Sequence, residues 1–273
     1  MVLIAVAGGT GLAGRAVVAH AVAAGHQVRS LSRYLPALEK RVPGAEYISA
    51  DFRAGTGVRP GLAGVDVLIE TLDARSGAAL RALPIMSVAV LDAAAKAGIF
   101  RCVLLTIINA GECANGYYQA QAARALSYKK SGMSTTVVEA AQFHNLVAGI
   151  FSTGAKVGVI PSFRGVSFQS LSTPDLAEVL VTHALRDGAE KRLVFAGGPD
   201  VQSMQQMAQA WKSATGSKSV VTPLPLPGSL GVFLRAGKNL LPDLSAGPVG
   251  TGGGEVVLGS VGFGEWLAGR ATA

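Results

Sequence analysis

The chain has 273 residues, of which 49% are hydrophobic and 15% are charged, and its formal net charge is +7. This length is enough for one large α/β domain, and so apolar a composition excludes extensive disorder. The 24 Lys and Arg residues are scattered along the chain, without zinc-finger spacing or a basic-aromatic stripe. We therefore predict no nucleic-acid partner.

The cysteines and the N-terminal residues bear on whether this is a disulfide-rich, secreted or membrane protein. Cys102 and Cys113 are too few for a disulfide framework, and neither has neighbours that mark a nucleophile. The apolar N-terminal run is broken by Gly8-Gly9 and then by Arg15, so it reads as neither a signal peptide nor a membrane span. We expect a cytoplasmic protein, monomeric or homodimeric, without a membrane partner. The histidines have no partners in the sequence, so we predict no metal site.

The first half of the chain alternates between strand and helix patterns. A continuous apolar run at residues 2–7 is typical of a parallel strand buried on both faces. Alternation at this spacing indicates βαβ units and a Rossmann-type, doubly wound α/β fold. The predicted strands are 2–7, 27–32, 45–48, 65–70, 102–108 and 135–139, and the predicted helices are 12–24, 84–97 and 117–131.

The second half is less regular. The stretch 223–254 is rich in Pro and Gly and is interpreted as a mobile segment over the site. We predict a Rossmann domain at 1–150, with parts of 166–200, and a smaller C-terminal region at 151–273 that is no independent domain. The predicted strands here are 156–160, 166–171 and 192–195, and the predicted helices are 174–186, 203–215 and 263–267.

A glycine-rich loop separates the first strand from the first helix. Gly8, Gly11 and Gly14 have G-x-x-G-x-x-G spacing, which allows a tight turn, close approach of a pyrophosphate, and close packing of helix on strand. The helix N-terminus then offers free N–H groups to the phosphates. Thr10 and Leu12 belong to the same predicted site. The alternative is a tight turn that binds nothing.

The ends of the next strands predict which dinucleotide binds. Ser32-Arg33 follows the second strand with no acidic residue in reach, and an arginine there pairs with the 2′-phosphate of NADP. The alternative is a solvated surface arginine. We expect Asp51, with Phe52, at the adenine, and Thr71 and Leu72 along the cofactor.

The chain resembles the atypical short-chain dehydrogenases of the NmrA-like group over nearly its whole length. The resemblance is carried by the glycine loop with Arg33, by Ala50-Asp51-Phe52, and by later segments. These later segments are 64–68, Tyr117-Tyr118-Gln119-Ala120-Gln121, Ser131-Gly132-Met133, Ala141-Gln142-Phe143-His144, 174–177 and 264–268.

The resemblance also implies catalytic positions. In catalytic relatives a Ser, a Tyr and a Lys four residues later carry out hydride chemistry, the Lys lowering the pKa of the Tyr. Here Tyr117 matches the Tyr and Thr106 the Ser, but Gln121 stands at the Lys position and supplies no charge. We expect Arg124 at the surface or facing a phosphate. Phe143 and His144 are expected on the substrate side, and the alternative for His144 is a hydrogen-bonded structural role.

Two functions follow from these residues. The first is an NADPH-dependent reductase of a small apolar carbonyl, quinone or enone, because hydride donation needs mainly an oriented nicotinamide and a dry pocket. The second is a non-catalytic NADP(H)-binding sensor or regulatory protein, which the missing Lys and the NmrA-like resemblance favour. An isomerase or epimerase with tightly held cofactor is a third, weaker reading.

Overall fold

The computed structural model describes residues 1–242 and 253–271. Its main sheet has eight parallel strands in the order β12-β9-β6-β5-β4-β1-β2-β3. The order 3-2-1-4-5-6 within it is that of a doubly wound dinucleotide-binding sheet, so the predicted α/β class is confirmed. The strands are β1 (Leu3–Ala7), β2 (Gln27–Ser32), β3 (Ala45–Ser49), β4 (Val67–Glu70), β5 (Arg101–Ile107), β6 (Ser134–Ala140), β9 (Arg192–Gly197) and β12 (Glu255–Leu258).

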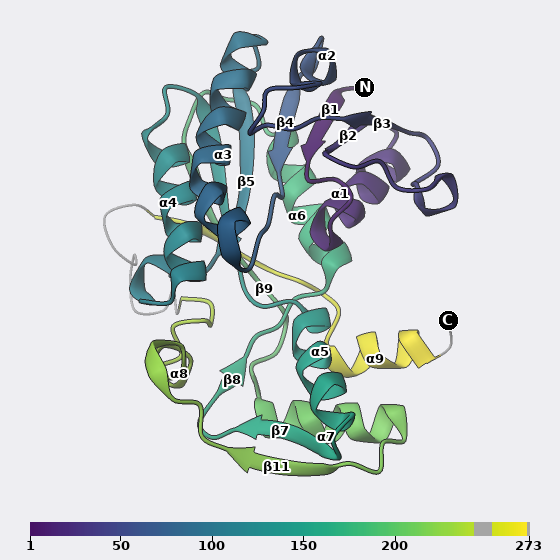
Figure 1. Ribbon diagram of the computed structural model, residues 1–273, viewed down its shortest axis with the longest axis vertical. Coiled ribbons are helices and arrows are strands. Elements are labelled where there is room, and N and C mark those ends of the chain that lie inside the picture. The colour runs from purple at the N-terminus through teal and green to yellow at the C-terminus, as the bar shows by residue number, and fades with distance from the viewer. Residues whose placement is uncertain (243–252, 272–273) are drawn as a thin grey trace.

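Helices cover both faces of this sheet (Figure 1). α1 (Leu12–Ala23) packs beside α6 (Thr173–Leu185) on one face, and α3 (Gly77–Lys96) beside α4 (Gly116–Lys130) on the other. Strand β1 is buried from both sides because its side chains alternate: Ile4 and Val6 face the first helix pair, whereas Ala5 and Ala7 face the second. The short helix α2 (Val58–Leu62) precedes β4.

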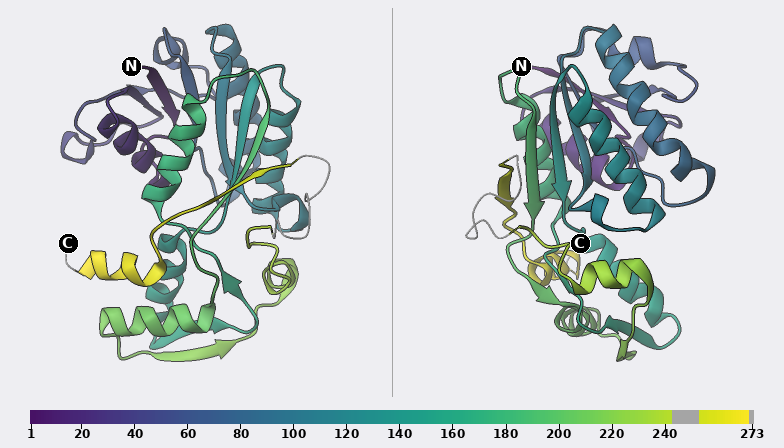
Figure 2. Two further views of the ribbon diagram at one scale, coloured as in Figure 1. Left: turned by 180° about the vertical axis from the view of Figure 1, so that it is seen from behind. Right: turned by 90° about the vertical axis from the view of Figure 1, so that its left-hand side faces the viewer.

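A smaller layer lies beyond the carboxyl ends of the main strands, at the bottom of Figure 1 and in both views of Figure 2. It has its own apolar core, which includes Phe151, Phe168, Met204 and Trp211. The chain returns from it to the main sheet through α6, β9 and β12. Its elements are α5 (His144–Ala155), β7 (Val159–Phe163), β8 (Ser167–Phe168), β10 (Gln202–Ser203), α7 (Met204–Thr215), β11 (Val220–Leu224), α8 (Gly228–Arg235) and α9 (Phe263–Ala271).

Several element boundaries differ from the sequence predictions. α3 begins at Gly77, so Pro84 lies inside the helix and does not open it. Part of the segment predicted to be mobile, 223–254, forms helix α8, and residues 243–252 of it lie outside the described residues. Strand β12 was not predicted, and it extends the main sheet beyond β9.

Helix α3 is long and apolar enough to span a membrane by length and composition alone. In the fold it packs against α4 and the sheet, as core helices of the same composition do. The cytoplasmic location stays a prediction.

Candidate functional site

A cavity of about 910 Å³ opens at the carboxyl ends of β1, β2, β4, β5 and β6, between the main sheet and the smaller layer. This edge, where the strand order reverses between β1 and β4, is where open α/β sheets bind ligands. Most of the residues predicted from the sequence line it, and Gly14 and His144 do not. The predicted residues that line it are Gly8, Thr10, Gly11, Leu12, Ser32, Arg33, Asp51, Phe52, Thr71, Leu72, Thr106, Tyr117, Gln121 and Phe143.

The glycine loop is shaped by close backbone contacts. Gly8 has φ +84°, and a Cβ there would meet the backbone of Thr71 and Leu72 at 3.0 Å. A Cβ at Gly14 would overlap the Gly8 carbonyl oxygen and lie 2.6 Å from the Thr71 hydroxyl. Gly11 differs, because its Cβ would meet only the Gly8 oxygen, at 3.3 Å, and would otherwise project into the cavity. Gly8 and Gly14 therefore build the turn, and Gly11 leaves the space in front of helix α1 empty.

Two arginines reach the cavity from the ends of adjacent strands, Arg33 after β2 and Arg53 after β3. Beside Arg33, the Thr10 hydroxyl donates to the Ser32 hydroxyl at 2.9 Å. Asp51 uses Oδ1 to accept from the backbone N–H groups of Arg53 (2.8 Å) and Ala54 (3.2 Å). Asp51 thus holds the turn that presents Arg53, and its carboxylate retains acceptor capacity for a ligand.

A buried ion pair lies behind the middle of the cavity. Arg124, 1% exposed, donates from Nη2 to Glu70 Oε1 at 2.8 Å and from Nε to the Ser87 hydroxyl at 2.8 Å. Glu70 also accepts from the hydroxyls of Ser87 and Tyr128. The expectation that Arg124 lies at the surface is therefore wrong, although Arg124 does line the cavity. Because the Glu70 carboxylate is fully buried at the end of an apolar strand, it requires a buried cation, and Arg124 of α4 is that cation.

Arg124 also orients Gln121, the residue at the expected lysine position. Its Nη1 donates to Gln121 Oε1 at 2.6 Å, so the Gln121 amide nitrogen points the other way and donates to Asp73 Oδ1 at 3.3 Å. The Tyr117 hydroxyl donates to the same Asp73 oxygen at 2.9 Å. A continuous hydrogen-bond chain thus runs from the buried ion pair to the cavity.

This arrangement holds the Tyr117 proton instead of releasing it. Burial raises the pKa of Tyr117 well above 10, and the negative charge of Asp73 raises it further. The Thr106 hydroxyl is also engaged, since it donates to the Gln121 carbonyl at 3.2 Å. Lys129 is directed elsewhere and pairs with Glu139 at 3.2 Å. The described residues therefore contain no activated Tyr–Lys pair.

His144 lies outside the cavity. Its Nε2 donates to the Val261 carbonyl at 3.0 Å, so its Nδ1 accepts from the Ser170 hydroxyl at 2.7 Å. Its ring also contacts Phe263 and Trp266 of α9. Burial lowers the pKa of the His144 imidazole, which favours this neutral form. These contacts agree with the alternative prediction for His144, a hydrogen-bonded structural role, and do not place its side chain on the substrate side.

The part of the cavity beyond Tyr117, which we call the substrate half, is almost entirely apolar. Its wall includes Leu230 and Leu234 of α8 and Leu226, which precedes this helix. Among the described residues that we assign to this half, none is Lys, Arg, Asp or Glu, whereas the Asp73–Arg75 pair lines the cavity at Tyr117. The substrate half is formed by Tyr118, Ala140, Ala141, Gln142, Phe143, Leu146, Ile150, Phe163, Phe168, Leu226, Leu230 and Leu234.

Sequence reasoning missed Asp73, Arg53 and the α8 wall. Asp73 follows Thr71 and Leu72 directly, so an acidic residue at the carboxyl end of a buried strand was a usable signal. Arg53 stands two residues after Asp51 and was readable in the same way. The α8 leucines carried no signal, because they lie in a Pro/Gly-rich segment whose helix is set by packing.

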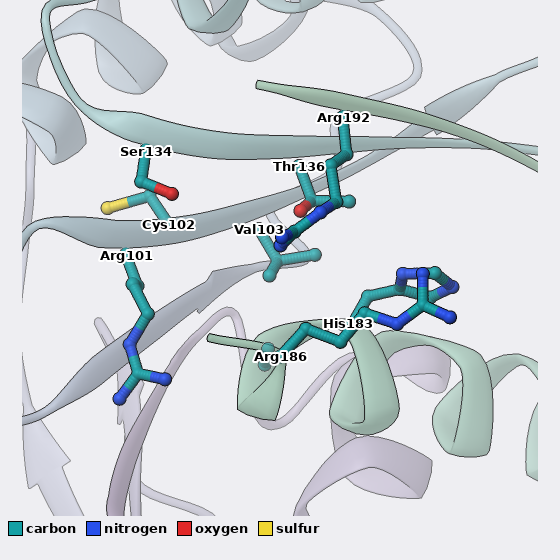
Figure 3. A pocket seen from close by; sticks show the side chains of 9 residues that line it. Arg101, Cys102, Val103, Ser134, Thr136, His183, Arg186 and Arg192 are labelled. Carbon is teal, nitrogen blue, oxygen red and sulfur yellow. The ribbon is translucent and has the colours of Figure 1, made fainter. Parts of the chain in front are cut away.

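A second hollow lies at the opposite edge of the sheet, where β5, β6 and β9 begin (Figure 3). Three arginines gather there, but Arg101 pairs with Asp187 at 3.3 Å and Arg186 with Glu255. The cavity volume is about 10 Å³, room for about one water molecule. This edge is therefore an ion-pair cluster with little free volume, and the large cavity is the candidate ligand site.

Comparison with known proteins identifies the family. Residues 8–187 match the model of the NAD(P)H-binding family. The chain belongs to this family. The match contains the glycine loop, the two arginines and the Tyr117–Asp73–Gln121 chain. No curated protein matches the sequence at a significant level.

Solved structures share the fold at low sequence identity. An NADPH-dependent quinone oxidoreductase from Escherichia coli has a TM-score of 0.72 and 17% identity, over 98% of this chain and 99% of that chain. A triphenylmethane reductase from Citrobacter sp. has a TM-score of 0.67 and 19% identity, over 86% and 88%. A UDP-glucose 4-epimerase from Thermotoga maritima has a TM-score of 0.72 and 15% identity, over 99% and 97%. The resemblance to atypical short-chain dehydrogenases is thereby confirmed for the fold.

The residues present fit a bound dinucleotide. The empty space in front of Gly11, which a Cβ would fill, faces the N-terminus of the 12-residue helix α1, where the first N–H groups lack partners within the helix. Arg33 and Arg53 stand at the ends of the neighbouring strands, ready to pair with phosphate oxygens.

Proposed function

We propose that this protein is an NADPH-dependent reductase that reduces a small, neutral, apolar carbonyl compound, quinone or enone. The observation that carries the proposal is the division of the cavity into two halves of opposite character. The cofactor half contains the glycine loop with Arg33 and Arg53, whereas the substrate half has apolar walls and no charged side chain among its described residues. Such a pocket favours uncharged, apolar molecules and excludes water.

Each group in the cofactor half has a binding role in this proposal. Gly8, Gly11 and the α1 N-terminus receive the pyrophosphate, while Ser32, Arg33 and Arg53 hold the 2′-phosphate and select NADPH over NADH. Bound NADPH supplies the hydride. Gln121, its N–H fixed by Arg124, and Thr71 border the nicotinamide side of the site.

The chemistry suits an acceptor that needs little acid assistance. The Tyr117 hydroxyl donates its hydrogen bond to Asp73 and has a raised pKa, so it is a weak proton donor to a substrate. Quinones meet this condition, because the hydroquinone anion formed by hydride addition is stabilised by its ring. One of the structural neighbours is named as an NADPH-dependent quinone oxidoreductase, and another as a triphenylmethane reductase.

The epimerase neighbours share the fold but suggest a different substrate. A nucleotide sugar carries a diphosphate, and burying it beside apolar walls without a cation is costly. Among the described residues assigned to the substrate half, none is Lys or Arg, and Arg75, which lines the cavity near Tyr117, is paired with Asp73 at 3.6 Å. We therefore do not extend the epimerase activity to this chain.

The second candidate is an NADP(H)-binding sensor without turnover. The engaged hydroxyls of Tyr117 and Thr106 favour it, since neither is free to serve a substrate. Such a sensor would bind the same dinucleotide, and binding would change its affinity for a partner protein.

One experiment separates these functions. The oxidation of NADPH is followed with purified protein and a panel of 1,4-naphthoquinone, cyclohexenone, acetophenone and UDP-glucose, and NADP⁺ and NADPH are titrated in parallel. The reductase predicts turnover with the quinone and none with UDP-glucose. Tight binding of NADPH with no turnover on any carbonyl acceptor would instead support the sensor. Gly11→Val, which fills the pyrophosphate space, is the matched control and should abolish both signals.

A further inference from the structure

The substrate half has two polar side chains, Tyr118 and Gln142, and their polar atoms have a fixed arrangement. Gln142 follows β6 and is 7% exposed. Its Oε1 accepts from Asn239 Nδ2 at 3.3 Å, whereas its Nε2 is buried with no hydrogen-bond partner in the described part of the chain. A buried amide nitrogen without a partner costs stability, so this atom requires an explanation.

The direction of the Gln142 amide is set by a backbone carbonyl. Asn239, fully buried after α8, donates from the same Nδ2 to the Ser167 carbonyl at 2.8 Å. A carbonyl only accepts, so the Asn239 amide cannot be turned around. Its second N–H then requires an acceptor from Gln142, which forces Oε1 toward Asn239 and Nε2 away from it. Asn239 is thus a positioning residue for Gln142.

Tyr118 lines the same half of the cavity as Gln142. The amide is close enough to lower the pKa of Tyr118, while burial raises that pKa to about 12. The Tyr118 ring is fixed by edge-to-face contacts with Phe233 of α8, at 5.2 Å, and with Tyr117, at 6.0 Å. The Tyr118 hydroxyl finds no acceptor for its proton among residues 1–242 and 253–271, in contrast to Tyr117, which donates to Asp73.

We propose that the Tyr118 hydroxyl and the Gln142 amide together bind the acceptor oxygen of the substrate, so that a carbonyl on a flat apolar ring is held by this pair and not by Tyr117. The inference rests on the proposed function and names the specificity-determining residues of the same site. The proposal explains why the Tyr118 hydroxyl and Gln142 Nε2 have no acceptor in an otherwise apolar pocket. A carbonyl oxygen that enters the pocket can accept a hydrogen bond from each of them.

Equilibrium binding to the NADP⁺-loaded protein tests the proposal without turnover. The probes are 1,4-naphthoquinone and 1,4-dimethylnaphthalene, which has methyl groups in place of the oxygens. Tyr118→Phe should weaken naphthoquinone about 3- to 10-fold, the value of one or two neutral hydrogen bonds. It should leave dimethylnaphthalene and NADP⁺ within about twofold. Tyr47→Phe, which removes a phenol hydroxyl outside the cavity, should leave both probes unchanged.

The positioning role of Asn239 has its own readout. Asn239→Asp cannot donate to Gln142, so the Gln142 amide should turn around and accept the Tyr118 proton. The preference for naphthoquinone over dimethylnaphthalene should then fall as far as in Tyr118→Phe. A purely structural role would weaken both probes equally.

Two results would overturn the proposal. One is a wild-type protein that binds naphthoquinone no better than dimethylnaphthalene, or not at all. The other is a loss of naphthoquinone affinity in Tyr117→Phe but not in Tyr118→Phe. A wild-type protein that binds naphthoquinone through Tyr118 but never oxidises NADPH would support this site and contradict the reductase. The second of the two overturning results, found together with quinone turnover, would support the reductase and contradict this site.

Discussion

Arg33 and Arg53 end two neighbouring strands and turn one end of the cavity cationic. A 2′-phosphate placed between them gains charge-assisted hydrogen bonds, each of about 1.5–3 kcal/mol. Arg33→Glu removes one such partner and adds a repulsive charge, so we expect NADPH affinity to fall about 100-fold. NADH affinity should change less than about threefold. Calorimetric titration of both nucleotides measures this, and Arg33→Gln is the milder control. Equal losses for NADPH and NADH would remove the 2′-phosphate assignment.

Gln121 offers a second test among single residues. A lysine here would restore the pattern of catalytic relatives, but Arg124 already directs an N–H of its buried guanidinium at the Gln121 oxygen. Gln121→Lys would place a second cation there and leave that N–H unpaired. We expect a loss of about 1–3 kcal/mol in the free energy of unfolding, and no gain in reductase rate.

Urea unfolding and the naphthoquinone assay measure these two effects. Gln121→Met, which removes the acceptor without adding charge, is the matched control and should lose less stability than the lysine variant. A faster reductase with unchanged stability would show that Arg124 does not govern this position.

Among the elements, β4, α3 and α4 are joined by one buried polar cluster. Glu70 of β4 accepts from Ser87 of α3 and from Arg124 and Tyr128 of α4. Removing one partner of a buried ion pair leaves the other charge uncompensated, at a cost of about 3–5 kcal/mol. Arg124→Met should therefore destabilise the fold by this amount in urea unfolding.

The double variant Glu70→Leu/Arg124→Met is the control, since it removes both charges together. It should be more stable than Arg124→Met alone. If the double variant lost as much as the sum of the two single variants, the pair would not be coupled.

Among the secondary-structure elements, the regular strands that are buried on both faces could be predicted from the sequence. The start of α3 could not be predicted, because Pro84 suggested a first turn. The helix begins seven residues earlier, at Gly77, and Leu83 in these added turns is buried. Helix α8 was missed because Pro and Gly surround it and its leucines acquire a face only against the cavity. Strand β12 is short and pairs with residues 61 positions earlier in the chain, which the local sequence pattern does not reveal.

Some residues of the candidate site could likewise be predicted from the sequence, and others could not. The glycine loop and Arg33 could be read because their role depends on local backbone shape and on position after a strand. Gln121 could be read as a departure from the relatives. The bonding of Asp73, Arg124, Gln142 and Asn239 joins segments far apart in the chain, so only the fold shows which polar atoms are satisfied and which are free.

At the scale of the whole molecule, buried histidines link stability to pH. Burial lowers the pKa of both His144 and His183 below 6.5. In the window between these lowered values and 6.5 the unfolded chain binds more protons than the native protein, so the free energy of unfolding falls as the pH drops through it. The stability is fully present above 6.5 and is lost toward the folded pKa.

The His144 contribution can be isolated. His144→Gln keeps hydrogen-bonding capacity but does not titrate, so it should flatten the fall in urea midpoint between about pH 7.5 and pH 5. His183 leaves a residual slope in that variant. An unchanged slope would show that His144 titrates alike in both states, against its contacts with Val261 and α9.

The reductase proposal depends on joining a cationic cofactor half to an apolar substrate half in one cavity. The most direct measurement is the kcat/KM for 1,4-naphthoquinone with saturating NADPH, compared with that at an equal concentration of NADH. The account predicts quinone-dependent oxidation of NADPH at a rate at least about tenfold above that of NADH, the equivalent of one hydrogen bond to the 2′-phosphate. Quinone-dependent oxidation of neither nucleotide, by protein that binds NADPH, would contradict it.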